Sequence, residues 1–394
     1  MPSPDPPRIL RLTLRDFRNH AALDLAASRG FVALSGENGA GKTNILEALS
    51  LFAQGRGLRR AEFADMTRIG AAGFTVSVAL GGEGGEHRLG TSFTRVPGGR
   101  GERLCRIDGA NAPSAAAFAE HLRLVWLTPD LDGLFRGPPG ERRRFLDRLV
   151  LAVDARHASR VSALERALRA RNRLLEESRG GPWLDAAERE LAELAVAVAV
   201  ARRDTAGRLD AELLAQADRA SPFPSGRLAL AGPFEDLAAG LPALDQEEAY
   251  LRELRAGRAR DAAAGRALIG PQTSDLLVRH GPRDMPAELC STGEQKALLL
   301  RLVLAHARLT ERLSGIAPLL LLDEVAAHLD PVRRSALFGE LKGFGSQVWM
   351  TGADPGLFAE LAGEADLVGI GPSGPLGRPA AFPASSRPLP EELP

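Results

Sequence analysis

Cysteine is almost absent from this chain of 394 residues, which contains only Cys105 and Cys290. The two residues stand in no spacing typical of a metal site, so a cysteine-based zinc site is excluded. So few cysteines also fit a protein of the reducing cytosol better than a disulfide-bonded one. We therefore expect a cytoplasmic protein.

Long apolar runs are missing as well. No run approaches the about 18 consecutive apolar residues that indicate a transmembrane helix. The N-terminal residues 1–7 are rich in proline and contain no apolar stretch of the kind found in a signal peptide. We therefore expect a chain that neither spans nor binds a membrane.

Aromatic residues and lysine are scarce. Aromatics make up 5% of the chain, too few to suggest a stacking platform for single-stranded bases. Basic and acidic residues balance at 50 each, so net charge gives no reason to expect an anionic partner. Only Lys42, Lys296 and Lys342 are lysines. Because the composition is so strongly biased to arginine, arginine counts alone prove little.

One stretch is nevertheless locally basic. Residues 136–173 hold eleven arginines against four acids. Guanidinium groups on one helical face would neutralise phosphates and bind DNA without sequence preference. The same residues could instead form a solvated face with internal ion pairs. A second candidate patch comprises Arg56, Arg59 and Arg60.

The most specific motif is an octet that fits the Walker A spacing, Gly36-Glu37-Asn38-Gly39-Ala40-Gly41-Lys42-Thr43. An apolar run at 31–34 predicts a buried strand before it, and residues 44–49 have helical spacing after it. The glycines allow backbone N–H groups to point at phosphate oxygens, and the helix start adds partial positive charge. Lys42 would reach the β- and γ-phosphates, and Thr43 would ligate Mg²⁺. The octet predicts binding of a nucleoside triphosphate.

A second pair of acids follows an apolar run. Residues 317–322 are apolar throughout, which is typical of a parallel strand buried on both faces, and Asp323 and Glu324 follow directly. As a Walker B motif, Asp323 would hold Mg²⁺ beside Thr43. Glu324 would orient the attacking water or accept its proton. The alternative is a buried strand that merely ends in solvated acids.

The segment Ser291-Thr292-Gly293-Glu294-Gln295 precedes a predicted helix that ends near residue 312. A Ser-x-Gly turn at a helix start offers a hydroxyl and free N–H groups to an anion. The same residues are close to a capping box, which would make Ser291 an ordinary N-cap. The order along the chain favours the anion site: Walker A, this turn, Walker B, then Asp330.

This ordered set resembles the ABC-type ATPase head and, within that superfamily, the RecF family of bacterial DNA repair. The residues that carry the resemblance are 16–20, 36–43, 138–147, 270–271, 291–295, 322–324 and 351–354. The resemblance implies an α/β fold, an ABC-type P-loop ATPase head split by an α-helical hairpin arm. It also implies that Ser291 and Gly293 face the nucleotide of a second protomer, with Asp330 at the same interface.

The family resemblance further implies ATP and Mg²⁺ as cofactors, weak ATPase activity and an ATP-dependent homodimer. The partners implied are duplex DNA beside single-strand gaps and a RecR-like mediator protein, in recombinase loading, the damage response and replication restart. Two alternatives stay open: the nucleotide-binding subunit of an ABC transporter, and a short SMC-like ATPase that organises chromosomes. The insertion argues against the transporter, and heptads that are not sustained argue against the SMC-like protein.

The predicted organisation places the head at residues 1–122 and 269–370, the helical arm at 123–268 and a proline-rich disordered tail at 371–394. Within the arm we expect helices at 141–177, 183–220 and 245–268. Two ABC-type features have only weak candidates. Gln54 is the nearest candidate for the glutamine that follows the P-loop helix, and Asp354 stands where a switch histidine is sought.

Overall fold

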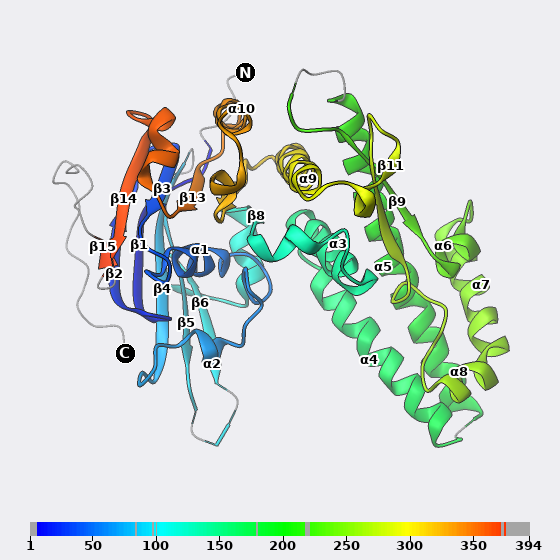
Figure 1. The fold of residues 1–394 in the computed structure, drawn as a ribbon. Helices are drawn as coiled ribbons and strands as arrows, with labels where there is room; N and C mark the ends of the chain where they lie inside the picture. Colours follow the sequence, from blue (N-terminus) through cyan, green and yellow to red (C-terminus); the bar gives the residue numbers. More distant parts are fainter. Residues whose placement is uncertain are drawn as a thin grey trace.

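The computed structural model describes residues 6–82, 85–96, 98–99, 101–178, 180–216, 221–371 and 374–375. It consists of a two-sheet head from which a helical arm projects (Figure 1). The predicted tail lies almost entirely outside the described residues. No helix in the described part of the chain combines the length and apolar character needed to cross a membrane.

The first sheet of the head is antiparallel and has the order β2-β1-β4-β5-β6-β7. Its strands are β1 (Arg8–Phe17), β2 (His20–Ala26), β4 (Gly73–Gly82), β5 (Gly85–Thr94), β6 (Glu102–Ile107) and β7 (Ala110–Ala112). In β4 every second side chain is buried, and in β1 the buried residues are Ile9, Leu12, Leu14 and Phe17, with a register shift between Ile9 and Arg11. The sheet therefore has one apolar face.

The second sheet has the order β15-β14-β3-β13-β12-β8, and its central strands are parallel. The strands are β3 (Phe31–Ser35), β8 (Leu124–Leu127), β12 (Leu319–Leu322), β13 (Val348–Gly352), β14 (Ala365–Gly371) and β15 (Gly374–Pro375). Along β12, Leu319 and Leu321 face one apolar core, whereas Leu320 and Leu322 face another. The prediction of a strand buried on both faces is therefore confirmed.

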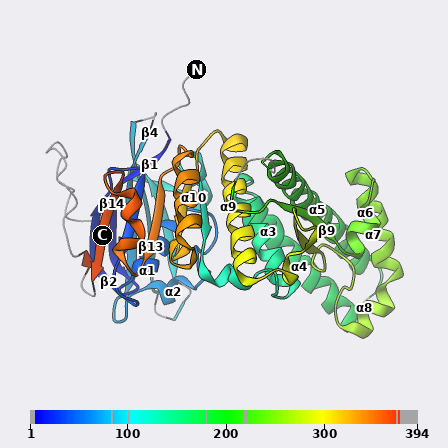
Figure 2. The same ribbon diagram turned by 45° about the horizontal axis from the view of Figure 1, so that its top comes forward.

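Two layers cover this parallel sheet. The first core lies between the two sheets and contains α1 (Lys42–Ser50). The second core lies on the opposite face, against α9 (Thr292–Ser314) and α10 (Pro331–Lys342). Figure 2 shows α9 and α10 between the sheets and the arm. The head also contains α2 (Phe63–Met66) and the short 3₁₀ turns η1 (Ala115–Glu120), η2 (Pro129–Gly133), η3 (Ala287–Leu289), η4 (Val325–His328) and η5 (Pro355–Leu361).

The arm is more divided than the sequence predicted. It contains α3 (Pro139–Val153), α4 (His157–Glu176), α5 (Pro182–Ala215), α6 (Pro233–Ala238), α7 (Ala243–Ala256) and α8 (Arg258–Ala264). The helix expected over 141–177 is two helices, because Asp154 accepts a hydrogen bond from the N–H of Arg156 and ends the first one. The helix expected over 245–268 breaks at Gly257.

Two further differences concern strands. The antiparallel sheet β11-β10-β9 was not predicted; it comprises β9 (Gly226–Ala231), β10 (Asp275–His280) and β11 (Met285–Pro286). Strand β8 pairs with β12 in the head sheet, although the predicted boundary assigned residues from 123 onward to the arm. The sequence does predict a strand at residues 122–127, so the boundary was placed wrongly and the strand itself was not missed.

Candidate active site

The octet forms a loop between β3 and α1, as its flanking sequences predicted. Gly36, Gly39 and Gly41 have φ values of 151°, 85° and 103°. A Cβ atom at Gly36 would lie 2.2 Å from the carbonyl oxygen of Ile370, and one at Gly41 would lie 2.6 Å from the Asn19 amide. Only glycine fits both positions, so the loop backbone can curl as a phosphate-binding loop requires.

Lys42 begins α1, and its side chain turns back over the loop. Its Nζ donates hydrogen bonds to the carbonyl oxygens of Gly36 (2.7 Å) and Glu37 (2.9 Å). The residue is only 4% exposed. A buried ammonium group at a helix N-terminus creates a strongly positive site, which suits phosphate oxygens.

The two Walker motifs meet at Asp323. Strand β12 ends at Leu322, and the Asp323 carboxylate accepts a hydrogen bond from Thr43 Oγ1 at 3.0 Å. Asp323 is 5% exposed, and burial raises its pKa, although hydrogen bonds from Thr351 and Thr43 oppose the rise. It forms no ion pair with any described residue. A buried carboxylate and a hydroxyl side by side are oxygen ligands of the type that Mg²⁺ takes.

Glu324 follows in an unusual backbone conformation. Its φ of 55° is left-handed, which costs a non-glycine residue about 1–2 kcal/mol. Its N–H donates to Thr351 Oγ1 at 2.9 Å, and the same Thr351 hydroxyl donates to the Asp323 carboxylate at 2.6 Å. Thr351 was noted in the sequence only for the family resemblance, and no role was predicted for it.

Two residues of the 16–20 segment, Asn19 and His20, support the loop through hydrogen bonds. Asn19 donates to the Ala40 carbonyl at 3.1 Å and accepts from Asn44 at 2.7 Å. The His20 ring lies 3.2 Å from the Gly41 carbonyl, and burial lowers its pKa. These contacts explain how residues 21 positions away in the chain help to hold the shape of the octet.

Ser291 is the N-cap of α9 and forms a complete capping box with Glu294. Its hydroxyl donates to the Glu294 carboxylate at 2.8 Å and also accepts from the Glu294 N–H at 3.4 Å. Among the described residues, no hydrogen bond or ion pair connects Ser291 to residues 36–43. Within one chain, Ser291 therefore acts as the N-cap that the sequence offered as an alternative. Gly293, in the first turn of the helix, is exposed. Asp330 likewise caps α10 through the N–H of Arg333.

The two weak candidates lie elsewhere. Gln54 lines a small cavity with Leu124 and Arg148, beside the first residue of β8, whereas Asp323 contacts Leu127 at the last residue of that strand. Gln54 is thus a lining residue of this cavity and does not line the pocket that contains Asp323 and Glu324. Asp354 accepts from the N–H of Gly356 and caps η5 instead of entering the site.

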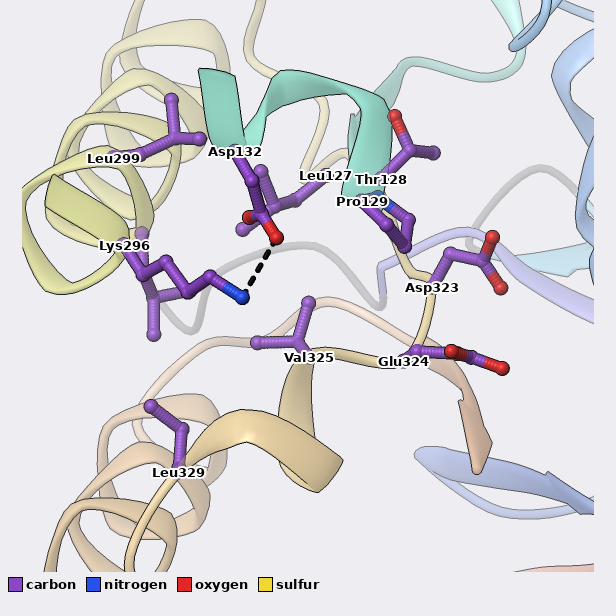
Figure 3. Close-up of a pocket in the computed structure, with 11 residues that line it drawn as sticks. Leu127, Thr128, Pro129, Asp132, Lys296, Leu299, Asp323, Glu324, Val325 and Leu329 are labelled. Carbon is purple, nitrogen blue, oxygen red and sulfur yellow. Dashed lines mark ion pairs between the residues drawn. The ribbon is translucent and has the colours of Figure 1, made fainter. Parts of the chain in front are cut away.

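A pocket connects the acids to α9 (Figure 3). Thr128, Val325 and Leu329 line it, and Lys296 of α9 forms a 2.7 Å ion pair with Asp132 across it. The carboxylates of Asp323 and Glu324 project to the same side, away from this ion pair (Figure 3). The pocket thus places the helix that carries Ser291 next to Walker B.

Five of the eleven arginines in the 136–173 stretch are partly or fully buried: Arg142, Arg143, Arg148, Arg160 and Arg171. Arg142 forms a bidentate pair with Asp275 at 2.8 and 2.7 Å, and Arg143 donates to the Ser274 carbonyl. Arg171 is completely buried between two acids, and Arg148 stacks on aromatic rings. The internal ion-pair interpretation therefore describes much of this stretch.

Arg60 and Arg144 differ from these arginines. One comes from each candidate basic patch, and the two lie close enough to repel each other. Both are exposed. Burial lowers the pKa of Arg60, and repulsion from Arg144 lowers it further, as does repulsion from Arg56. Arg144 has one long ion pair, at 4.0 Å from Glu141, whereas Arg56 pairs with Glu62. Positive charge therefore collects where the segment after α1 approaches the start of the arm, with Asp147 and Glu165 as the acids that act on Arg60.

Comparisons with known proteins agree with this geometry. The family model for the RecF/RecN/SMC N terminal domain matches residues 8–370. The DNA replication and repair protein RecF of Mesorhizobium japonicum is 52% identical over 364 residues, covering 92% of this chain and 96% of the relative. The protein of the same name from Brucella suis is 50% identical over 370 residues, covering 93% and 95%.

Solved structures show the same fold. A structure of the recombination mediator protein RecF with ATPrS, from the RecFOR pathway, superposes with a TM-score of 0.84 at 20% identity, covering 96% of this chain and 100% of that one. An SMC head domain from Pyrococcus furiosus gives 0.52 at 19% identity, covering 94% and 95%. The predicted ABC-type head fold is confirmed.

Proposed function

The chain belongs to the RecF family of DNA replication and repair proteins, and we propose that it is an ATP-dependent DNA-binding ATPase of recombinational repair and replication restart. The observation that carries this proposal is the 3.0 Å hydrogen bond between Thr43 and Asp323. It brings Walker A and Walker B into one site beside the buried Lys42. Family membership leaves no reason to favour a transporter subunit or a chromosome-organising ATPase.

We assign ATP and Mg²⁺ to this site. Residues 36–43 would hold the triphosphate through their N–H groups, and Lys42 would exchange its loop carbonyls for phosphate oxygens. Thr43 and Asp323 would hold Mg²⁺, which supplies charge neutralisation at the transferring phosphoryl group. Glu324 would orient the attacking water and accept its proton.

The active form is proposed to be a dimer. Within one chain, Ser291 and Gly293 have no contact with residues 36–43 among the described hydrogen bonds and ion pairs, so they are available to a second copy. ATP would then lie between Lys42 of one protomer and Ser291 of the partner subunit. Hydrolysis would be slow, because it waits for this assembly.

The proposed binding partner is duplex DNA beside single-strand gaps. Arg60 and Arg144 offer exposed charge suited to the phosphate backbone, which is the sequence-independent mode of binding. A structural neighbour is described as a recombination mediator of the RecFOR pathway, and by analogy we propose a RecR-like mediator as partner and recombinase loading as the outcome. Since chromosomal DNA is the proposed binding partner, we place the protein in the cytoplasm.

The test of this function compares wild type with Lys42→Ala in two assays, ATP-dependent dimerisation by light scattering and retention of gapped duplex DNA. Lys42→Ala should lose ATP binding, and with it both responses. Lys342→Ala is the matched control, because Lys342 lies in α10 and forms a surface ion pair with Glu364. If Lys42→Ala dimerised and retained DNA with ATP as wild type does, the proposed function would be wrong.

A further inference from the structure

Strand β13 lies between the strands that lead into the two Walker motifs. It pairs in parallel with β3 on one side and with β12 on the other. Leu322, the last residue of β12, is in register with Met350, and Thr351 is in register with Leu34. Thr351 therefore follows directly beside Asp323, on the sheet edge where parallel strands collect polar groups.

The Thr351 hydroxyl makes two directed contacts, and the residue is completely buried. It donates to Asp323 Oδ1 at 2.6 Å and accepts from the Glu324 N–H at 2.9 Å. A hydroxyl has a single proton to donate, so this geometry fixes its orientation. Asp323 Oδ1 also accepts from Thr43. With Oδ1 occupied twice, Oδ2 is the oxygen left to meet a ligand.

The contact to Glu324 concerns the backbone. A left-handed residue persists only where its surroundings hold it, and the bond from the Glu324 N–H is such a restraint. The φ of 55° sets the direction in which the Glu324 side chain leaves the strand. In Figure 3 both carboxylates point to the same side of the chain. One hydroxyl therefore links the orientation of one acid to the backbone of the other.

We propose that Thr351 is a positioning residue for ATP hydrolysis, which orients Asp323 toward Mg²⁺ and fixes the backbone of Glu324. The proposal rests on the ATPase function proposed above, and assigns to Thr351 the task of holding the two acids in register. Groups that orient metal ligands typically cost 10–100-fold in metal affinity or activity when removed.

The experiment compares Thr351→Val, which keeps the shape and removes the hydroxyl, with Thr351→Ser, which keeps the hydroxyl. Thr310→Val is the matched control: Thr310 is completely buried in α9, and its hydroxyl has no hydrogen-bond partner in the described structure. Binding of a fluorescent ATP analogue is measured in EDTA and during a Mg²⁺ titration. ATP hydrolysis and thermal unfolding are measured on the same samples.

Thr351→Val should need about 10–100-fold more Mg²⁺ for half-maximal strengthening of nucleotide binding, and its hydrolysis rate should fall by a similar factor. Its nucleotide affinity in EDTA should change less than about twofold, because Lys42 and the loop remain. Thr351→Ser should restore both values, and Thr310→Val should match wild type.

Two results would overturn the proposal. One is a Mg²⁺ dependence of Thr351→Val equal to that of wild type. The other is a loss of nucleotide affinity in EDTA as large as the loss in Mg²⁺, which would indicate a general structural role. A failure of the proposed function gives a different pattern, since wild type itself would then bind no nucleotide. If wild type binds Mg²⁺ and ATP but does not hydrolyse it, the Mg²⁺ titration still decides the role of Thr351.

Discussion

Thr43 and Asp323 are separated by 280 positions in the chain, yet a 3.0 Å hydrogen bond joins their side chains. The bond spans the entire arm insertion, because Thr43 lies in the first turn of α1 and Asp323 directly follows β12, the strand after α9. The head is therefore one folding unit assembled from both ends of the chain. Its site depends on the pairing of β3, β13 and β12 rather than on a local segment.

Replacing Glu324 by Gln should trap the ATP-bound dimer on DNA. The amide keeps the shape but cannot accept a proton, and loss of a general base typically costs 10²–10⁴-fold in rate. Nucleotide binding should persist, since Lys42 and Asp323 remain. The measurement is ATP hydrolysis alongside the lifetime of the dimer on gapped duplex DNA.

Asp323→Asn serves as the contrast for this variant. It makes the same chemical change one residue away, but should weaken Mg²⁺-dependent nucleotide binding and form no trapped dimer. Glu324→Gln hydrolysing ATP at the wild-type rate would show that Glu324 is not the proton acceptor.

Replacing Ser291 should separate nucleotide binding from dimerisation. Ser291→Ala should still bind ATP but fail to dimerise, because the hydroxyl offered to the second protomer is lost. The variant also loses the helix cap, which costs about 1 kcal/mol of stability. Light scattering with ATP, together with nucleotide binding on the same samples, measures the two effects.

Ser291→Asp distinguishes the cap from the anion site. Aspartate is a good N-cap, so α9 should remain stable, but its charge would repel a phosphate group. We expect this variant to fold as wild type, bind ATP and stay monomeric. Normal dimerisation of Ser291→Asp would contradict the composite site.

Local pattern was enough to predict the parts of the site that are built from consecutive residues. The octet with its flanking strand and helix, and the apolar run before Asp323, lie where expected. Thr351 was missed because its role comes from neighbouring strands and not from its own segment. Likewise, the pairing of Arg142 with Asp275, 133 residues away, could not be read from a local count of charges. Long-range contacts thus decide which arginines stay available.

Stability should fall in mild acid because of His306. This residue of α9 is completely buried in protein, and its Nε2 lies 2.9 Å from the Leu149 carbonyl of α3, so the neutral ring donates Nε2–H. Burial lowers its pKa to about 4. Between about pH 6.5 and pH 4 the unfolded chain binds a proton that the native protein does not, so the free energy of unfolding decreases as pH falls, by up to about 3 kcal/mol.

The check is urea unfolding of wild type and His306→Gln from pH 7.5 to pH 4.5. Glutamine keeps an N–H donor but does not titrate, so the variant should lose less stability than wild type over this window. The stabilisation from neutral His306 is complete above pH 6.5 and disappears as pH falls. Parallel pH profiles for the two proteins would rule out His306 as the source.

DNA binding should depend on Arg60 and Arg144 more than on other exposed arginines. The double variant Arg60→Ser/Arg144→Ser removes charge at the point where the segment after α1 approaches the arm. Each lost phosphate contact lowers the slope of log K against log salt by about 1, so the slope should fall by about 2. Fluorescence anisotropy with a gapped duplex at several salt concentrations measures this slope.

The matched control is Arg169→Ser/Arg252→Ser, which removes the same charge from two exposed arm residues that pair with acids on their own helices. Its salt slope should equal that of wild type, because these arginines are proposed to lie outside the DNA path. ATP-dependent dimerisation should be normal in both double variants, since neither touches the Walker residues. If the two double variants lost the same affinity, the DNA would be held by general positive charge, and no surface at the junction of head and arm would need to be invoked.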